Sequence, residues 1–269
     1  MSASPATPSA HAAALTGPAR KPLYLATHNP VQIDAGAHWL VVKRSDAPTA
    51  RYPLARIARI VCNRNADWSG AALALCLTHQ IPIAWVDGHG RPLGSALARH
   101  GLVQPLDAAL ETYLELPGWP VRYENWLTRR RLETLTTCTI RALREGRAPD
   151  AATFQALKRE YVYNRHHPLA FGPEGEGWCH ALVVAHLHTA GLQARYWGYD
   201  GRPLELADDL AGLLWAELNL ECGAMSAATD NRPTLMRMFE SWARYRESRL
   251  ATHLADLKRH VAREVETWQ

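Results

Sequence analysis

The sequence lacks the features that define several familiar classes of protein. It has few cysteines, and no two of them form a Cys-x-x-Cys pair. Their scatter excludes a disulfide framework and a cysteine-rich zinc site, and it is typical of a cytoplasmic protein. No apolar run approaches the roughly 18 residues of a membrane-spanning helix, so we expect no contact with a membrane. The five cysteines are Cys62, Cys76, Cys138, Cys179 and Cys222.

Lysine is also scarce, since only four of the 30 basic residues are lysines. Arginine supplies the rest, and its planar guanidinium suits bidentate contacts to phosphate. A net charge of +4 and a pI of about 8.9 are likewise consistent with nucleic acid as a partner. A GC-rich genome produces the same arginine bias, and the alanine-rich composition supports that explanation. Basicity alone therefore identifies no function.

The N-terminal residues are rich in Ala, Ser and Pro, without the basic start and apolar stretch of a signal peptide. We expect a disordered tail over residues 1–21. The remaining sequence has no Walker-type phosphate loop and no dinucleotide-binding fingerprint. Gly88 and Gly90 belong to a predicted hairpin turn rather than to a nucleotide site.

Residues 22–103 predict a small strand-rich domain that carries one short helix. Strands are expected where β-branched and aromatic residues cluster between turn-forming residues. Ser69 is a candidate N-cap for the helix, which ends near Leu77. The expected strands are residues 22–27, 39–43, 57–62 and 81–86, and a tight turn is expected at Asp87–Gly90.

Residues 104–269 predict an all-helical domain, because apolar residues recur there at helical spacing. The Gly- and Pro-rich residues 167–177 are expected to form a loop, and Gly191 is a candidate C-cap. A strand-rich domain followed by a helical one gives the fold class α+β. The expected helices are residues 106–116, 121–144, 151–163, 178–190, 204–218 and 233–266.

The order of these segments resembles CRISPR-associated protein 1, the integrase of CRISPR spacer acquisition. The match is best from Ala55 to Leu97 and extends over about residues 22–220. The motifs that carry it are Pro53-Leu54, the hydrophobic strand Ile57–Cys62, the Ser-capped helix Ser69–Leu77, the strand Gln80-Ile81-Pro82-Ile83, the turn Asp87–Gly90, Ala190-Gly191-Leu192, and Gly201-Arg202-Pro203-Leu204 followed by Ala207-Asp208-Asp209-Leu210.

The resemblance implies metal-dependent strand transfer, in which a DNA 3′-hydroxyl attacks a phosphodiester. In that family a Glu, a His and an Asp hold a divalent cation, Mg or Mn, which stabilises charge on the attacking and leaving oxygens. Asp209, with Asp208 beside it, matches the aspartate, and Glu160 lies near the position of the glutamate. Both features also have a structural interpretation. Asp208 and Asp209 can be an acidic pair in the first turn of a helix, and Glu160 can be a surface ion-pair partner.

The sequence departs from the family at two further positions. The histidine is expected just before Gly201, where Tyr199 and Asp200 stand instead, and Gly212 replaces a polar residue after the aspartate. The resemblance therefore implies a DNA-binding protein of spacer acquisition whose nuclease and strand-transfer activity is weakened or lost. The alternative is a fully active enzyme with substituted ligands.

The resemblance also implies several partners. These are DNA, a second copy of the chain bound through the strand-rich domain, and either CRISPR-associated protein 2 or an active paralogue. The run Arg129–Arg131 has few acidic neighbours and is the first candidate for phosphate contacts, followed by Arg51 and Arg59. The last two can equally protect the edge of a sheet. A further alternative is a protein-interaction module that uses the ten tryptophans for its contacts.

Overall fold

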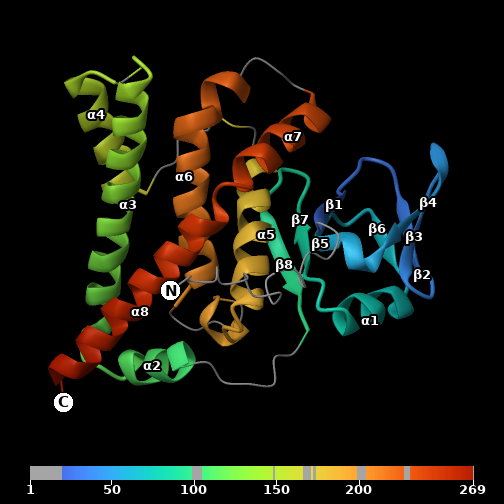
Figure 1. Ribbon diagram of the computed structural model, residues 1–269, viewed down its shortest axis with the longest axis horizontal. Coiled ribbons are helices and arrows are strands. Elements are labelled where there is room, and N and C mark those ends of the chain that lie inside the picture. Colours follow the sequence, from blue (N-terminus) through green and yellow to red (C-terminus); the bar gives the residue numbers. More distant parts are fainter. Residues whose placement is uncertain are drawn as a thin grey trace, which may run out of the picture.

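The computed structural model describes residues 20–98, 105–147, 149–165, 171, 174–198, 204–226 and 231–268. A strand-rich region and a helical region lie next to each other (Figure 1). The predicted tail over 1–21 falls almost wholly outside the described residues, and Lys21 already belongs to a strand. Within these ranges, no helix is long and apolar enough to cross a membrane.

The strand-rich region contains two four-stranded sheets. The first has the order β1-β5-β7-β8, in which β1, β5 and β7 run parallel and β8 returns antiparallel. The second has the order β4-β3-β2-β6, so β4 lies at an edge. The strands are β1 Lys21–Leu25, β2 Val31–Ala35, β3 Trp39–Arg44, β4 Ala47–Pro53, β5 Ile57–Cys62, β6 Ala66–Trp68, β7 Ile83–Val86 and β8 Pro92–Ala96.

Local sequence signals place the helix and the turn of this region as predicted. Helix α1 spans Gly70–Thr78, and the Ser69 hydroxyl accepts a hydrogen bond from the Ala72 amide at 3.2 Å. The Asp87 carboxylate accepts from the amides of His89 and Arg91 at 2.8 and 2.9 Å, which closes the turn before β8.

The helical region begins after β8, with α2 starting at Pro105 (Figure 1). Helices α5 and α6 lie side by side at its centre, and α8 crosses diagonally toward α2. A π-helical turn over Lys158–Tyr163 follows α4. The helices are α2 Pro105–Leu114, α3 Trp119–Arg144, α4 Ala151–Leu157, α5 Glu174–Thr189, α6 Leu206–Ser226, α7 Arg232–Ala243 and α8 Glu247–Trp268.

Several helix boundaries differ from the sequence prediction, and α6, for example, ends at Ser226 rather than at residue 218. The single helix expected over 233–266 is two helices, because the amides of Tyr245 and Arg246 bond to carbonyls three residues back and turn the chain. Helix α5 begins at Glu174 rather than at Trp178. Its glycines serve close packing instead of a loop: a Cβ on Gly175 would lie 2.5 Å from the Trp215 ring.

Gly177 provides a test of this packing. A Cβ there would lie 2.0 Å from the Gly90 carbonyl oxygen and 2.5 Å from Val86 Cγ1. Because a backbone carbonyl cannot rotate away, we expect Gly177→Ala to lower the free energy of unfolding by about 1–3 kcal/mol in urea denaturation. Gly70→Ala is the control, since nothing lies within 4 Å of its Cβ and alanine favours the helix. Equal stability of both variants would contradict the packing of α5 against the β7–β8 turn.

The first sheet is buried on both faces and joins the two regions. Val61 and Val86 pack into the core of the helical region, whereas Ile60 and Ile83 pack into the core of the strand-rich region. This two-sided burial explains why β5 and β7 are nearly continuous apolar runs. All five cysteines are buried and unbridged. Burial raises the pKa of the Cys62, Cys76 and Cys138 thiols to about 12, so they are not reactive thiolates.

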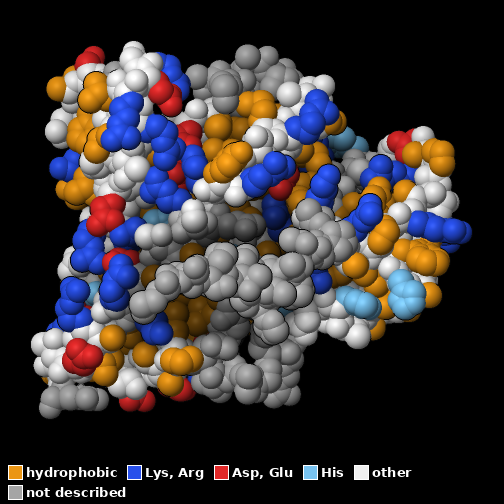
Figure 2. Space-filling model, in the orientation of Figure 1, with side chains coloured by type: hydrophobic (Ala, Val, Ile, Leu, Met, Phe, Trp, Pro, Cys, Tyr) orange, Lys and Arg blue, Asp and Glu red, His pale blue; other side chains and the backbone are white. Residues whose placement is uncertain are grey.

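Charged side chains are unevenly distributed on the face shown in Figure 2. Lys and Arg side chains gather over α7 and the adjoining strands with few acidic neighbours. Along α3 and α8 basic and acidic side chains alternate instead. The second pattern indicates ion pairing between helices, and the first indicates a surface with an excess of positive charge.

Candidate functional site

Three helices converge on the acidic pair at the start of α6. The Asp208 carboxylate lies 3.3 Å from Nε2 of His180, a buried residue of α5. The Tyr123 hydroxyl of α3 donates to Asp209 Oδ2 at 2.8 Å. His180 is one of the histidines that the sequence offers as a spatial substitute for the missing ligand. Tyr123 is not predicted from the sequence, because it is 86 residues from Asp209 and the two meet only through packing.

The surroundings of Asp209 disfavour its charged form. Burial raises the pKa of this carboxyl to about 6, against the lowering effect of the Tyr123 hydrogen bond and the Arg131 charge. The carboxylates of Glu205 and Glu124 add to the rise. Arg131 is held by Glu124 at 3.2 Å, which reduces its influence on Asp209. At neutral pH Asp209 is thus a carboxylate in a site that does not stabilise its charge well.

Glu160 lies in the π-helical turn, with an exposed side chain that accepts a hydrogen bond from the Asn164 amide at 3.2 Å. A metal site needs at least three ligand atoms from His, Cys, Asp or Glu close to one another. Within the described ranges, one such group lies within 4.8 Å, and it consists of Cys138, Glu217 and Glu221. The structure therefore does not assemble Glu160, Asp208 and Asp209 into such a group.

The described residues at the start of α6 do not fit the divalent cation that the family implies. A hard cation needs several ionised oxygen ligands around one point. Here one oxygen of Asp209 accepts a tyrosine hydroxyl, its pKa is raised, and the Asp208 carboxylate faces an imidazole. Residues 199–203, where the family has its histidine, lie outside the described ranges. We derive no metal-dependent step from this arrangement.

The cluster of Cys138, Glu217 and Glu221 is better explained as a structural ion cluster. Oε1 of Glu217 lies 3.2 Å from Arg246 Nε and 3.5 Å from Arg249 Nη2. Glu221 pairs with Arg141 and Arg246 and accepts from Trp242 Nε1 at 3.0 Å. The Cys138 thiol is protonated, since burial raises its pKa to about 12. Arginines already neutralise the carboxylates, and a cation would be repelled.

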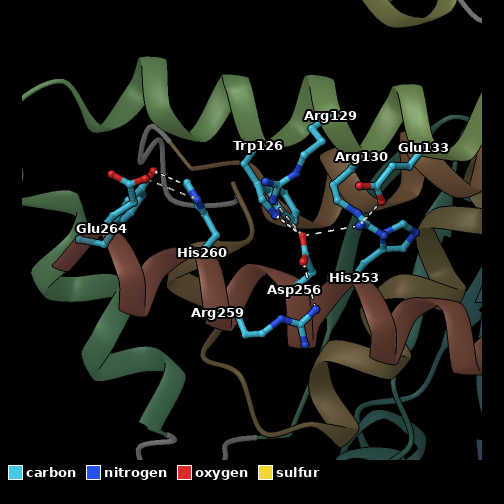
Figure 3. Close-up of polar contacts among 10 residues, drawn as sticks. Trp126, Arg129, Arg130, Glu133, His253, Asp256, Arg259, His260 and Glu264 are labelled. Atoms are coloured by element: carbon cyan, nitrogen blue, oxygen red, sulfur yellow. Dashed lines mark hydrogen bonds and ion pairs between the residues drawn. The ribbon is translucent and has the colours of Figure 1, made fainter. Parts of the chain in front are cut away.

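The arginines predicted to bind phosphate on α3 mostly connect helices within the fold (Figure 3). Arg130 is buried and donates a hydrogen bond from Nε to His253 Nδ1 at 3.1 Å. The Asp256 carboxylate accepts hydrogen bonds from Trp126 Nε1 at 3.0 Å and from Arg129 Nη2 at 3.2 Å. Burial and the Arg130 charge lower the pKa of His253 to about 3, so its imidazole is neutral and accepts. Arg131 is buried against Glu124.

Arg129 and Arg51 are the exposed members of the predicted phosphate-binding set. Arg51 lies on edge strand β4, with its guanidinium 5.9 Å from the centre of the Trp39 ring. That position also suits the alternative interpretation, protection of a sheet edge. Arg59 is 6% exposed and forms an ion pair with Glu240 of α7 at 2.6 Å.

This arrangement, two small sheets followed by a helical bundle, is also the fold of solved Cas1 structures. A CAS1 protein from Thermotoga maritima matches with a TM-score of 0.66 at 13% identity, covering 90% of this chain and 97% of that one. TtCas1 matches with a TM-score of 0.60 at 14% identity, covering 88% and 98%. TtCas1 in a complex with DNA matches with a TM-score of 0.53 at 16% identity, covering 92% and 91%.

The family model for the CRISPR associated protein Cas1 matches residues 23–114. No curated protein matches the chain by sequence. The match in the strand-rich region and the fold shared with solved Cas1 structures confirm the predicted resemblance to Cas1 proteins and the α+β class.

Proposed function

We propose that the chain is a DNA-binding protein of CRISPR spacer acquisition in which metal-dependent strand transfer is weakened or lost. One observation carries the second part: the acidic pair at the start of α6 is bound to Tyr123 and His180 and belongs to no three-ligand group among the described residues. Strand transfer needs a cation to stabilise the attacking and leaving oxygens of the phosphodiester. A pair held in this way does not offer that cation its ligands.

DNA binding rests on the fold and on charge. A structure with the same fold is a complex of TtCas1 with DNA, and another is a Cas6-RT-Cas1–Cas2 complex. The chain carries a net charge of +4, and Arg129 and Arg51 expose their guanidinium groups. We propose DNA, a Cas2-type protein or an active paralogue, and a second copy of the chain as partners. The exposed edge strand β4 offers the second copy a place to pair.

A fully active enzyme with substituted ligands is the second candidate, and the His180–Asp208 contact at 3.3 Å is the observation in its favour. A protein-interaction module that uses tryptophans has less support. Of the ten tryptophans, all of which lie in the described ranges, only Trp268 is exposed. The others stabilise the interior.

Strand transfer and DNA binding can be measured side by side. Labelled duplex would be incubated with a repeat-containing target and Mn²⁺ or Mg²⁺, using the wild type, Glu160→Ala, the double variant Asp208→Asn/Asp209→Asn, and a catalytically competent Cas1 as positive control. We expect binding that weakens steeply with salt, by about tenfold or more between 50 and 200 mM, because released counterions drive it. We expect no metal-dependent product from the wild type.

Each result decides between the candidates. Metal-dependent transfer that either variant abolishes would establish an active enzyme and contradict the loss of catalysis. Salt-sensitive binding without transfer would support a DNA-binding protein that acts beside an active paralogue. Absence of binding at low salt would refute the nucleic-acid function of the isolated chain.

A further inference from the structure

A cavity of about 980 Å³ lies between the strand-rich region and α7. Its wall comes from the start of β1, the β1–β2 connection, the β3–β4 hairpin, β5 and α7, with one residue of α5. The volume is in the range of small-molecule sites, about 300–1,000 Å³. Its charged residues are Arg20, Lys21, Arg44, Asp46, Arg59, Arg232, Arg237, Glu240 and Arg244.

The cavity is strongly positive. Seven of its charged residues are cationic and two are acidic, an excess of five, whereas the whole chain has a net charge of only +4. Arg237 and Arg244 are exposed, while Arg44, Arg59 and Arg232 are half-buried or buried. Like charges brought together beside low-dielectric walls raise the local concentration of anions.

Three of these arginines have a buried donor without an acceptor. The Nε atoms of Arg44, Arg59 and Arg232 are enclosed and have no hydrogen-bond partner. Such groups are rare in folded proteins, and each costs about 1–3 kcal/mol when it stays unsatisfied. Among the described residues, five arginines bury an Nε without a hydrogen-bond partner, and three of them line this one cavity; the other two are Arg195 and Arg246. An anion in the cavity would give these three an acceptor.

The Glu240 carboxylate, an acceptor in the wall of the cavity, is already occupied. Oε1 of Glu240 accepts from Arg59 Nη2 at 2.6 Å and also from the Tyr24 hydroxyl. Asp46, the other acid, is exposed and accepts from the Asn29 amide at 3.1 Å. The two carboxylates thus leave most of the arginine donors of the cavity to an external anion.

The N-terminus of α7 adds to this field. The helix begins at Arg232, has a proline in its first turn, and contributes Arg232 and Pro233 to the wall. The positive end of the helix dipole favours an anion at such a place. Backbone and side chains therefore select the same sign of charge.

The cavity is separate from the acidic pair of α6. It reaches α5 at Leu182, whereas Asp208 contacts α5 at His180. Two residues turn an α-helix by about 200°, so the two sites lie on different faces of α5.

We propose that this cavity binds the phosphate groups of a nucleotide. Arginine forks bind phosphate through paired, charge-assisted hydrogen bonds, and the volume accommodates a nucleotide. The phosphates can belong to a free nucleotide or to a nucleic-acid strand, and the same donors serve both. The site goes beyond the proposed function, since of its residues only Arg59 was a candidate for DNA binding.

The test is a binding titration of the full chain with ATP without metal, inorganic pyrophosphate, adenosine and a single-stranded oligonucleotide. We expect the phosphorylated probes to bind and adenosine not to bind. Arg44→Gln and Arg232→Gln should each weaken binding about tenfold, the loss of one charge-assisted contact. The matched control is Arg64→Gln, an exposed arginine outside the cavity. Thermal unfolding would verify that each variant is folded.

Glu240→Gln gives a prediction of opposite sign. Glutamine can still accept hydrogen bonds from Arg59 and Tyr24, so the contacts within the cavity wall are preserved. Because one negative charge is removed, the affinity for phosphate should rise several-fold. Binding of ATP would indicate a free nucleotide as ligand, and binding of the oligonucleotide alone would indicate a strand. The proposal is overturned if no phosphorylated probe binds, or if the Arg44 and Arg232 variants bind like the Arg64 control. Because duplex binding is measured separately, its failure would not affect this result.

Discussion

Glu217→Gln is expected to lower the free energy of unfolding by on the order of 3 kcal/mol, because breaking a buried ion pair leaves uncompensated charge. Glu217 is 1% exposed, and one of its oxygens lies 3.2 Å from Arg246 and 3.5 Å from Arg249. Arg246 retains Glu221 in the variant, which limits the loss. The cluster joins α6 to the junction of α7 and α8, so the effect should appear in the global transition. Urea denaturation followed by circular dichroism measures it.

Two further variants show whether the effect arises from the ion cluster. Glu266→Gln removes a carboxylate from the exposed end of α8 and should change stability by less than about 0.5 kcal/mol. In a double-mutant cycle with Arg249→Gln, the double variant should be more stable than the sum of the single losses predicts. Additive losses, or a loss for Glu217→Gln below about 1 kcal/mol, would contradict a stabilising cluster.

Asp209→Asn is expected to stabilise the protein at pH 7.5 by on the order of 3 kcal/mol. The pKa of this carboxyl is about 6 in the folded chain and 3.8 in a free residue, and one pKa unit corresponds to about 1.4 kcal/mol. The folded state holds the proton of Asp209 more tightly than the unfolded state does. The contribution of this group to wild-type stability is therefore complete below about pH 4 and is lost as pH rises through about 6. The variant lacks this loss, so the difference in stability should grow between pH 4 and pH 7.

The same measurement addresses the proposed loss of catalysis. Tyr123→Phe removes a donor that stabilises the Asp209 carboxylate, so it should raise the pKa further and extend the pH window upward. Destabilisation by Asp209→Asn at pH 7.5 would show that the fold depends on the charged form. In that case the carboxylate would be available as a metal ligand, which would argue for the active alternative.

The strand-rich region was predicted well because its signals are local. Ser69 caps α1 and Asp87 closes a turn through atoms within four residues of each, and alternating or continuous apolar runs mark the strands. The glycines of α5 were misread for the opposite reason. Glycine indicates a turn in the absence of other information, and its use for close packing depends on Trp215 and Gly90, which lie far away in the sequence.

The roles of charged residues depended on the tertiary structure. In sequence Arg130 looks like a free phosphate ligand, yet it is buried and contacts His253 and Asp256 once α8 packs on α3. Arg131 is buried too and pairs with Glu124 of the same helix. Likewise, the basic cavity draws on β1, β3, β5 and α7. No window of sequence contains that set, so no periodicity or spacing could indicate it.

The α+β class, the succession of a strand-rich and a helical region, the capped helix α1 and the likeness to the Cas1 family could be predicted from the sequence alone. These follow from local propensity, apolar patterning and ordered short motifs, which act over a few residues. Only the tertiary structure decided which charges are paired in the interior, which remain exposed, and where donors lack acceptors. Charge energies depend on burial and distance, and both are set by contacts between segments up to 216 residues apart, as between Tyr24 and Glu240.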